Sequence, residues 1–254
     1  MKNKELLGIC IFIICLFPLT LNAANYRAFS AKPFSENEVR FIFLGSSGVV
    51  LNSAAGAVVI DPATLLDDYD LDQLKTANVV LIVFTHSHGD HFDSGTAVKL
   101  FKATGAHILA DAMVVGILEG KIPRDRLING LNGKTYGFGK IAVDVIQGKH
   151  GSLINLYRIT MDRVRVFHGG DSGYVLLKNY PSDIAFVPTG IPSPSASPLE
   201  AIKMVLDLKP GVAVTMHGAE HQLHAFEEGI HSKLPNTRVI IPVKHVLKSV
   251  IIND

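Results

Sequence analysis

Four potential metal ligands lie within six residues of this chain, in the run Thr85-His86-Ser87-His88-Gly89-Asp90-His91. Imidazole nitrogens and carboxylate oxygens are the groups that hold divalent transition metals in proteins. One tetrahedral site does not accept four ligands so close together in sequence. The spacing therefore predicts that His86 and His88 converge on one ion, whereas Asp90 and His91 face a second. A histidine-rich solvated loop is the less favoured interpretation, because the run directly follows an apolar strand.

Three further candidate ligands follow expected strands elsewhere in the chain. His150 comes after residues 141–148, Asp171 comes after residues 164–167 and two glycines, and His217 comes after residues 212–216. Loops at strand ends are where α/β folds gather functional residues. A single histidine in such a place is more often a hydrogen-bonded structural residue. These three residues become candidates only because the first cluster is present.

The elements that must position these residues alternate between strands and helices. The run Val79–Phe84 is apolar without alternation, which is typical of a strand buried on both faces. Short β-branched runs separated by turn residues predict three antiparallel strands before it. The expected strands are 39–44, 49–52, 57–60, 79–84, 141–146, 153–160, 164–167, 184–187 and 212–216, and the expected helices are 94–104 and 199–208. This order predicts an α/β fold, a four-layer α/β/β/α sandwich. The Pro/Ser-rich segment 192–198 reads as a loop that either borders the site or is a plain surface connection.

The motifs resemble those of the metallo-β-lactamase superfamily. Residues 85–91 look like its His-x-His-x-Asp-His signature, and His150, Asp171 and His217 match its later metal motifs in order and approximate spacing. Asp61-Pro62 and the run 169–174 are similar to the branch of metal-dependent hydrolases that includes ascorbate-6-phosphate lactonase-like proteins. The resemblance covers the chain from about Val39 to its end and implies the metallo-β-lactamase sandwich.

The resemblance also implies a ligand set and a role for each member. It places His86, His88 and His150 on one ion, Asp90, His91 and His217 on the other, and Asp171 between the two ions. Asp90 would in addition orient the attacking hydroxide, which makes it the candidate catalytic residue. Asp61 would orient a ligand, although an ordinary turn residue before Pro62 is an equal interpretation.

The expected activity is hydrolysis by a hydroxide held between two divalent ions, on a small-molecule lactone, ester or amide-like bond. Zinc is the first choice because imidazoles dominate the site, and manganese and iron remain open. Phosphodiester hydrolysis uses the same machinery and remains an alternative, as do an iron-dependent oxygenase or redox protein and a noncatalytic metal-binding protein. Hydrolysis of β-lactams is not expected, because the commoner β-lactamases carry a cysteine where Asp171 stands. Flavoprotein relatives usually have Glu in place of His88 and need a flavin domain for which this length leaves no room.

Other polar residues near these motifs are candidates for supporting roles. His221 or His224 would donate a proton to the leaving group, or would simply be solvated. His168 is expected to pack near the site rather than to bind metal. Tyr174 and Asn155 are candidate hydrogen-bond donors to a developing oxyanion.

The N-terminus has the pattern of a secretory signal. Lys2 and Lys4 precede an apolar run over residues 6–19 and small residues before Ala24, so cleavage after Ala23 is expected. An uncleaved membrane anchor is the alternative. Both cysteines, Cys10 and Cys15, lie in this run, which leaves a single hydrolase domain over residues 24–254 without thiols.

Charge and composition restrict the partners of that domain. The chain has 24 Lys+Arg and 23 Asp+Glu, and loss of Lys2, Lys4 and Glu5 leaves 22 of each. A neutral domain gives no reason to expect nucleic acid or, after signal cleavage, an anionic membrane as partner. With 48% hydrophobic residues it can bury a substantial core. The expected location is secreted or periplasmic, and the sequence does not fix an oligomeric state.

Overall fold

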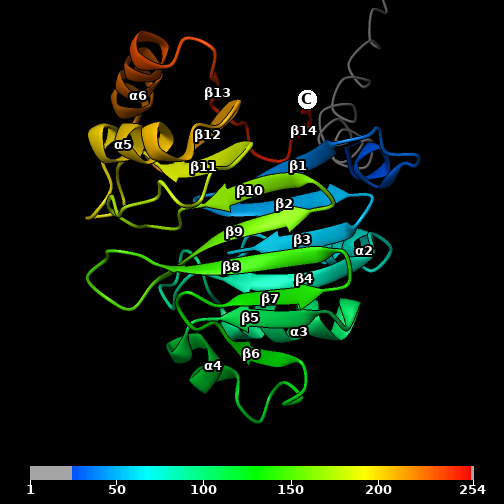
Figure 1. Ribbon diagram of the computed structural model, residues 1–254. Coiled ribbons are helices and arrows are strands. Elements are labelled where there is room, and N and C mark those ends of the chain that lie inside the picture. The colour runs from blue at the N-terminus through cyan, green and yellow to red at the C-terminus, as the bar shows by residue number, and fades with distance from the viewer. Residues whose placement is uncertain (1–24, 253–254) are drawn as a thin grey trace, which may run out of the picture.

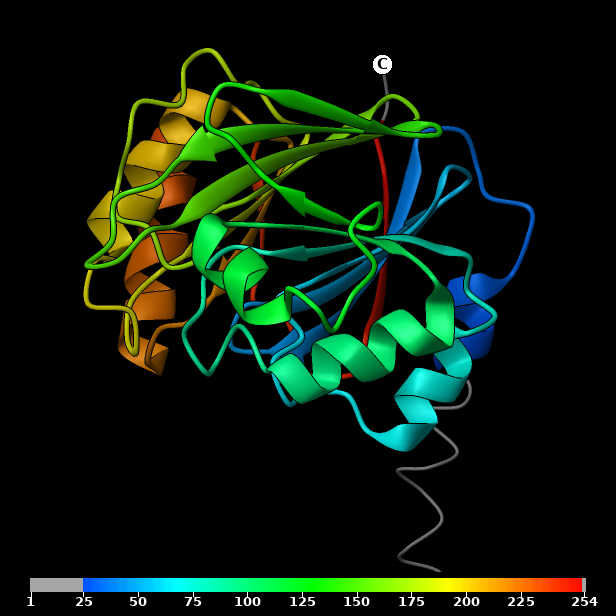
Figure 2. The ribbon, with the colours of Figure 1, turned by 90° about the horizontal axis from the view of Figure 1, so that it is seen from below.

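The computed structural model describes residues 25–252 as two β-sheets packed face to face, with helices on both outer surfaces (Figure 1). The view from below shows the sheets in the middle, with one helical layer against each (Figure 2). This arrangement confirms the expected four-layer α/β/β/α sandwich. The predicted signal segment and both cysteines lie outside the described residues. Within the described part, no helix combines the length and the apolar character needed to cross a bilayer.

The first sheet begins with the expected antiparallel meander and continues with parallel strands. Its seven strands lie in the spatial order β14 (Leu247–Ile251), β1 (Glu38–Gly45), β2 (Gly48–Ser53), β3 (Gly56–Ile60), β4 (Val79–Phe84), β5 (His107–Ala110) and β6 (Leu127–Asn129). Its outer face is covered by a helical segment at residues 25–30 and by α2 (Asp68–Leu74), α3 (Ser94–Thr104) and α4 (Ala112–Leu118). Strand β4 lies between two parallel neighbours and is buried on both faces, as its unbroken apolar run predicts.

The second sheet also has seven strands and two covering helices. The spatial order is β13 (Arg238–Ile240), β12 (Val212–Met216), β11 (Ile184–Pro188), β10 (Val164–His168), β9 (Asn155–Met161), β8 (Ile141–Gln147) and β7 (Thr135–Phe138). Its outer face packs against α5 (Pro198–Leu208) and α6 (Glu220–Lys233). The main core lies between the two sheets, where Phe41 of β1 meets Phe186 of β11 edge to face, with ring centroids 5.1 Å apart.

The ends of several strands define the functional edge of the sandwich. The loops that follow β3, β4, β8, β10 and β12 carry Asp61 and all seven predicted metal ligands. Two hydrogen bonds fix the sheets to each other at this edge: Tyr157 Oη donates to Phe84 O at 2.9 Å, and Asn155 N donates to Thr85 O at 3.0 Å. These bonds join the second sheet directly to the residues that precede His86.

The structure contains elements that the sequence patterns did not predict, and it corrects one boundary. The additional elements are the helical segment at residues 25–30, α2, β5, α4, β6, β7, α6, β13 and β14. Strand β9 begins at Asn155 rather than at Leu153, because residues 148–154 form the loop that carries His150. The segment 192–198 is irregular up to Ser197, whose side chain accepts a hydrogen bond from Glu200 N and caps α5.

Candidate metal centre

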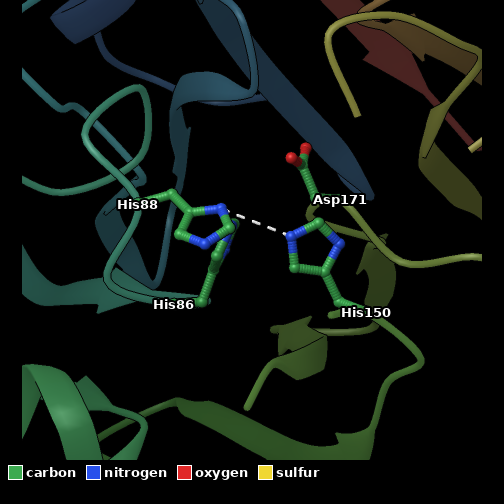
Figure 3. A group of neighbouring side chains, drawn as sticks. All are labelled: His86, His88, His150 and Asp171. Atoms are coloured by element: carbon green, nitrogen blue, oxygen red, sulfur yellow. Dashed lines mark hydrogen bonds between the residues drawn. The ribbon is translucent and has the colours of Figure 1, made fainter. Parts of the chain in front are cut away.

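Seven side chains from both sheets converge at the functional edge in two overlapping groups. The first group is His86, His88, His150 and Asp171, and the second is Asp90, His91, Asp171 and His217. In each group one ligand atom per residue lies within 4.8 Å of the others. Figure 3 shows the first group, with three imidazole rings and the Asp171 carboxylate gathered around a common space. The structure thus brings together every ligand predicted from the sequence, in the expected partition and with Asp171 shared.

The loop after β4 is folded so that its ligands face two directions. Two backbone N–H groups, of His91 and Phe92, donate to the carbonyl of His88 at 3.0 and 2.8 Å and turn the chain back. The ring of Phe92 packs edge to face on Phe84, with centroids 5.0 Å apart, which anchors the turn on the strand. Asp93 then caps α3 by accepting from Thr96 N at 2.7 Å. The spacing of the ligands follows from this single tight turn.

Asp61 orients two of the histidines through its buried carboxylate. Its Oδ2 lies 2.8 Å from His91 Nδ1 and accepts from the Thr85 hydroxyl at 2.6 Å, while its Oδ1 accepts from Thr85 N at 2.8 Å. Because the Thr85 hydroxyl donates to Asp61, its oxygen is free to accept from His86 Nδ1, 3.1 Å away. Both imidazoles are thereby held with Nε2 directed into the site. The orienting interpretation of Asp61 is therefore favoured over a turn residue alone.

Burial and neighbouring charges set opposite ionisation states for the two imidazoles. Burial lowers the pKa of His86 to about 3, which keeps this ring neutral and able to bind metal. Burial would also lower the pKa of His91, but the carboxylates of Asp61 and Asp171 outweigh it and raise that pKa to about 10. Binding of a metal ion to His91 Nε2 would therefore release a proton from this ring.

His217 occupies a strained turn at the end of β12. Its φ is +54°, in the left-handed region that side chains other than glycine seldom adopt. Hydrogen bonds fix this conformation: Thr189 Oγ1 donates to His217 O at 2.8 Å, and His217 N donates to Ser46 O at 3.3 Å. The Ser46 hydroxyl lies 3.5 Å from His217 Nδ1 and donates to Asp90 Oδ2 at 3.2 Å. Ser46 therefore contacts two ligands of the second group.

Asp171 lies where the two groups meet. Its Oδ1 is 3.0 Å from His91 Nε2 and 2.5 Å from His217 Nε2, and Ser193 donates to its backbone carbonyl at 2.7 Å. Burial would raise the pKa of Asp171, but the two imidazoles hold it well below its usual range. Gly170 precedes it with φ +51°, and a Cβ there would come within 3.1 Å of the Thr85 side chain. The close approach of this loop to the end of β4 therefore requires glycine.

The chemistry of these atoms fits divalent metal ions. Within residues 25–252, His86 Nε2 is buried without a hydrogen-bond partner, whereas His91 Nε2, His217 Nε2 and Asp171 Oδ1 are buried close to one another without the alignment of a hydrogen bond. Buried polar atoms without partners are costly and rare in native proteins. Three imidazole nitrogens and a carboxylate oxygen aimed into one space are instead the donors expected around zinc, manganese or iron.

The supporting residues proposed from the sequence divide into two classes. His168 is buried beside the site, where its Nδ1 accepts from Gly170 N at 3.3 Å and its Nε2 lies 2.9 Å from Ser47 O, so it fixes two site loops as expected. Tyr174 instead donates to Asp207 at 2.9 Å, and Asn155 donates to Gly130 O at 2.8 Å. The expectation that these two would face an oxyanion is wrong, because their polar atoms are already engaged elsewhere.

His221 and His224 lie on α6 and are exposed, not gathered with the ligands. His224 is near Glu220 and Glu227, at 3.9 and 3.8 Å, on the solvent side of the helix. The solvated interpretation therefore holds for both residues.

Three serines contact ligands and were not identified from the sequence. Ser46 contacts Asp90 and His217, Ser47 lies 2.8 Å from His91 Nδ1, and Ser195 Oγ lies 3.2 Å from His150 Nδ1. The only sequence signal for the first two is their place in a Gly-Ser-Ser-Gly turn between two strands. Ser195 lies in the Pro/Ser-rich segment, which therefore borders the site.

Comparison with known proteins agrees with this geometry. A profile of the beta-lactamase superfamily domain matches residues 58–218, more than half of the chain. The chain is 28% identical over 173 residues to the UPF0173 metal-dependent hydrolase of Staphylococcus aureus, and this match covers 60% of this chain and 73% of that protein.

Two solved structures share the fold. Igni18, a metallo hydrolase from Ignicoccus hospitalis, has a TM-score of 0.71 at 19% identity and covers 85% of this chain and 100% of its own. CmlA, a diiron β-hydroxylase from Streptomyces venezuelae, has a TM-score of 0.65 at 13% identity and covers 87% of this chain and 55% of its own. The chain therefore belongs to the metallo-β-lactamase superfamily.

Proposed function

We propose that this metal-dependent hydrolase binds two divalent ions and cleaves a lactone, ester or amide-like bond of a small molecule. The observation that carries the proposal is the convergence of seven side chains in two overlapping groups, in each of which one potential ligand atom per residue lies within 4.8 Å of the others. His86, His88 and His150 would hold one ion, and Asp90, His91 and His217 the other, with Asp171 shared. Zinc is the first choice for a site rich in imidazole.

The two ions, when bound, supply a Lewis acid and lower the pKa of a water molecule toward neutrality. The protein's own residues then determine where the reaction occurs. Asp90 is 39% exposed and lines a cleft, and the Ser46 hydroxyl fixes its Oδ2. A carboxylate in this position can accept a hydrogen bond from the attacking water and direct its lone pair toward a bound substrate. Asp90 is therefore the candidate catalytic residue of the second group.

A redox reaction is the second candidate. The fold is shared with the diiron hydroxylase CmlA, and imidazole and carboxylate ligands also suit iron. A nuclease is not favoured, because the domain has no net charge and nucleases bind nucleic acid mainly through basic patches.

We also propose that the protein is exported and acts outside the cytoplasm, since its first residues have the pattern of a signal peptide. Mass spectrometry of cell fractions tests this by detecting a chain that begins at Ala24. Recovery of only the full-length chain in the cytoplasm would contradict export.

The decisive experiment combines metal analysis with an activity panel. The purified protein is expected to hold about two zinc, manganese or iron ions per chain and to turn over one class among a lactone, an ester, a β-lactam and a bis-phosphodiester. His88→Ala and Asp90→Ala variants should lose at least about 100-fold of that activity, because each removes a ligand or the residue that orients water. His224→Ala, on the exposed face of α6, is the matched control and should keep it. Iron with oxygen consumption and no hydrolysis would overturn the proposal in favour of the redox candidate.

A further inference from the structure

A cleft of about 700 Å³ opens beside the second ligand group. Asp90 and His217 line it together with Ser46, so a molecule bound there would reach the candidate catalytic carboxylate. Much of its remaining wall is apolar and consists of Phe43, Leu65, Ile191, Pro192, Leu223, Ile241 and Pro242. Ile191 is 60% exposed, and exposed apolar surface next to a reaction site favours a substrate with an apolar part.

One cation interrupts this apolar wall. Among residues 25–252, Lys244 is the single lysine or arginine that lines the cleft. The ion pairs of the described part of the chain do not include Lys244, and the carboxylate that shares the cleft, Asp90, belongs to the ligand set. Lys244 is exposed at this cleft, and an ammonium group beside an apolar wall, without a carboxylate partner among the described residues, can bind the anionic group of a ligand.

The backbone of Lys244 is fixed by its neighbours. His245 N donates to Phe43 O at 2.8 Å, and Asn25 Nδ2 donates to His245 O at 2.7 Å. These bonds hold the segment that follows β13 against the end of β1. Lys244 therefore lies in an exposed turn between β13 and β14, whose next residue is held against β1.

The side chain of Lys244 lies across Gly45. A Cβ at Gly45 would be 2.6 Å from Lys244 Cε and 2.9 Å from Nζ, so the lysine occupies the space that a larger residue would need. The next residue, Ser46, contacts both Asp90 and His217. The ammonium group thus lies beside Gly45, the residue that precedes Ser46, and Ser46 supports the second ligand group.

We propose that the substrate is an anionic amphiphile and that Lys244 binds its anionic group, a carboxylate or a phosphate, while the apolar wall takes the rest. This inference rests on the proposed hydrolase function and specifies its substrate class. In the reaction, the oxygen of water forms a new bond to the substrate carbonyl carbon, the bond from that carbon to the leaving oxygen or nitrogen breaks, and the leaving atom takes a proton from the water. Lys244 takes no part in bond cleavage and determines which substrates are bound.

The test compares three esters that differ only at the end of the acyl chain. Para-nitrophenyl pentanoate is neutral, the mono-para-nitrophenyl ester of glutaric acid carries a carboxylate, and an ester of similar length with a terminal phosphate carries the other anion. The metal-loaded protein should prefer one of the anionic esters to the neutral one in kcat/KM, and the two anionic arms identify the anion. Lys244→Met should remove about tenfold or more of that preference, the size expected for a lost charged hydrogen bond.

Control variants separate charge recognition from general damage. Lys244→Arg should keep most of the preference, because it keeps the cation. Lys248→Met is the matched control, since Lys248 follows Lys244 by four residues, lies on β14 and does not line the cleft. As a measurement independent of turnover, free glutarate or an alkyl phosphate should bind the parent protein and the Lys248→Met variant more tightly than Lys244→Met in calorimetry.

The outcomes distinguish this inference from the proposed function. Hydrolysis of the neutral and anionic esters at equal rates, or an anionic preference that survives in Lys244→Met, would overturn the role of Lys244 and leave the hydrolase intact. The role of Lys244 would also be overturned if the protein hydrolysed none of the esters and bound neither anion. If anion binding depends on Lys244 but the esters are not hydrolysed, the anion site stands and the proposed cleavage of an ester bond falls.

Discussion

At the scale of single residues, the candidate centre depends on hydrogen bonds that select which nitrogen of each histidine faces the metal. Asp61 contacts Nδ1 of His91, Thr85 contacts Nδ1 of His86, and Ser195 contacts Nδ1 of His150. His150 is less buried than His86 or His91, so fewer neighbours restrain its ring. Ser195 is therefore the contact on which the orientation of His150 depends most.

Replacing Ser195 by alanine should weaken metal binding by the first group. The Ser195 hydroxyl lies 3.2 Å from His150 Nδ1, and its loss frees the ring to rotate. Loss of such an outer contact typically lowers metal affinity about 10- to 100-fold. Titration with a competing chelator measures the change for each of the two ions. Ser152→Ala, at an exposed position two residues after His150, should leave both affinities unchanged. Equal affinities in the parent protein and Ser195→Ala would show that His150 is oriented without the serine.

The convergence of the candidate ligands could be predicted from the sequence, whereas the residues that support them could not. His86, His88, Asp90 and His91 form a dense pattern that is typical of a metal site and unusual in an ordinary loop. A serine, in contrast, is common in turns, and the partner of Ser195 is 45 residues away in the chain. Such a contact depends on how two loops from different strands meet, and no local pattern records it.

At the scale of elements, a buried ion pair on β1 joins three separate segments. Glu38 is 7% exposed, and its carboxylate accepts from Arg40 Nε at 2.6 Å, from Ser35 N at 2.8 Å and from Ser249 Oγ on β14 at 2.8 Å. Arg40 also donates to the carbonyls of Ala28 and Ala31 in the N-terminal segment. Burial would raise the pKa of Glu38, but these hydrogen bonds lower it to about 2.

A Glu38→Gln variant should be less stable at neutral pH, by about 1–2 kcal/mol. Glutamine has nearly the same shape as glutamate but lacks the charge that strengthens these hydrogen bonds. The pKa of Glu38 is lower in the folded than in the unfolded chain, so its stabilisation is complete above about 4.5 and disappears as the pH falls through about 2. Urea unfolding at several pH values should therefore show the two proteins converging in acid.

The exposed Glu36 provides the control for this prediction, since its pair with Arg163 is 3.7 Å long and largely in solvent. Glu36→Gln should change stability little at any pH. A difference between Glu38→Gln and the parent protein that does not change with pH would mean that shape, not charge, is what Glu38 contributes.

The elements that the sequence did not predict have weak local patterns. Helix α6 has two buried apolar residues, Phe226 and Ile230, so its sequence carries little helical periodicity. Strands β6 and β13 have three residues each, and β14 pairs with β1 across some 200 residues of chain. The long apolar strands were predicted well, because burial on both faces leaves an unbroken run such as Val79–Phe84.

At the scale of the whole molecule, the candidate ligands come from both sheets. His86, His88, Asp90 and His91 follow a strand of the first sheet, whereas His150, Asp171 and His217 follow strands of the second. Each ligand group takes members from both sheets. Bound ions would therefore join the two halves of the sandwich at the functional edge.

Removal of the ions should lower thermal stability as well as activity. At a free concentration about 100 times the Kd, an ion that binds only the folded state stabilises it by about 2.7 kcal/mol, or roughly 5–10 °C for a domain of this size. Scanning calorimetry with and without a chelator measures the difference, and added zinc should reverse it. The Asp90→Ala variant should show a smaller shift, and an unchanged Tm in the parent protein would contradict metal binding at this edge.

The division of ligands between the sheets also has a consequence for the order of folding. Neither half of the chain carries a complete ligand group, so full coordination is possible only after the halves have docked. The ions would then bind late in folding. They would stabilise the docked state but not the transition state that leads to it. Zinc should consequently slow unfolding in stopped-flow experiments while leaving the refolding rate nearly unchanged.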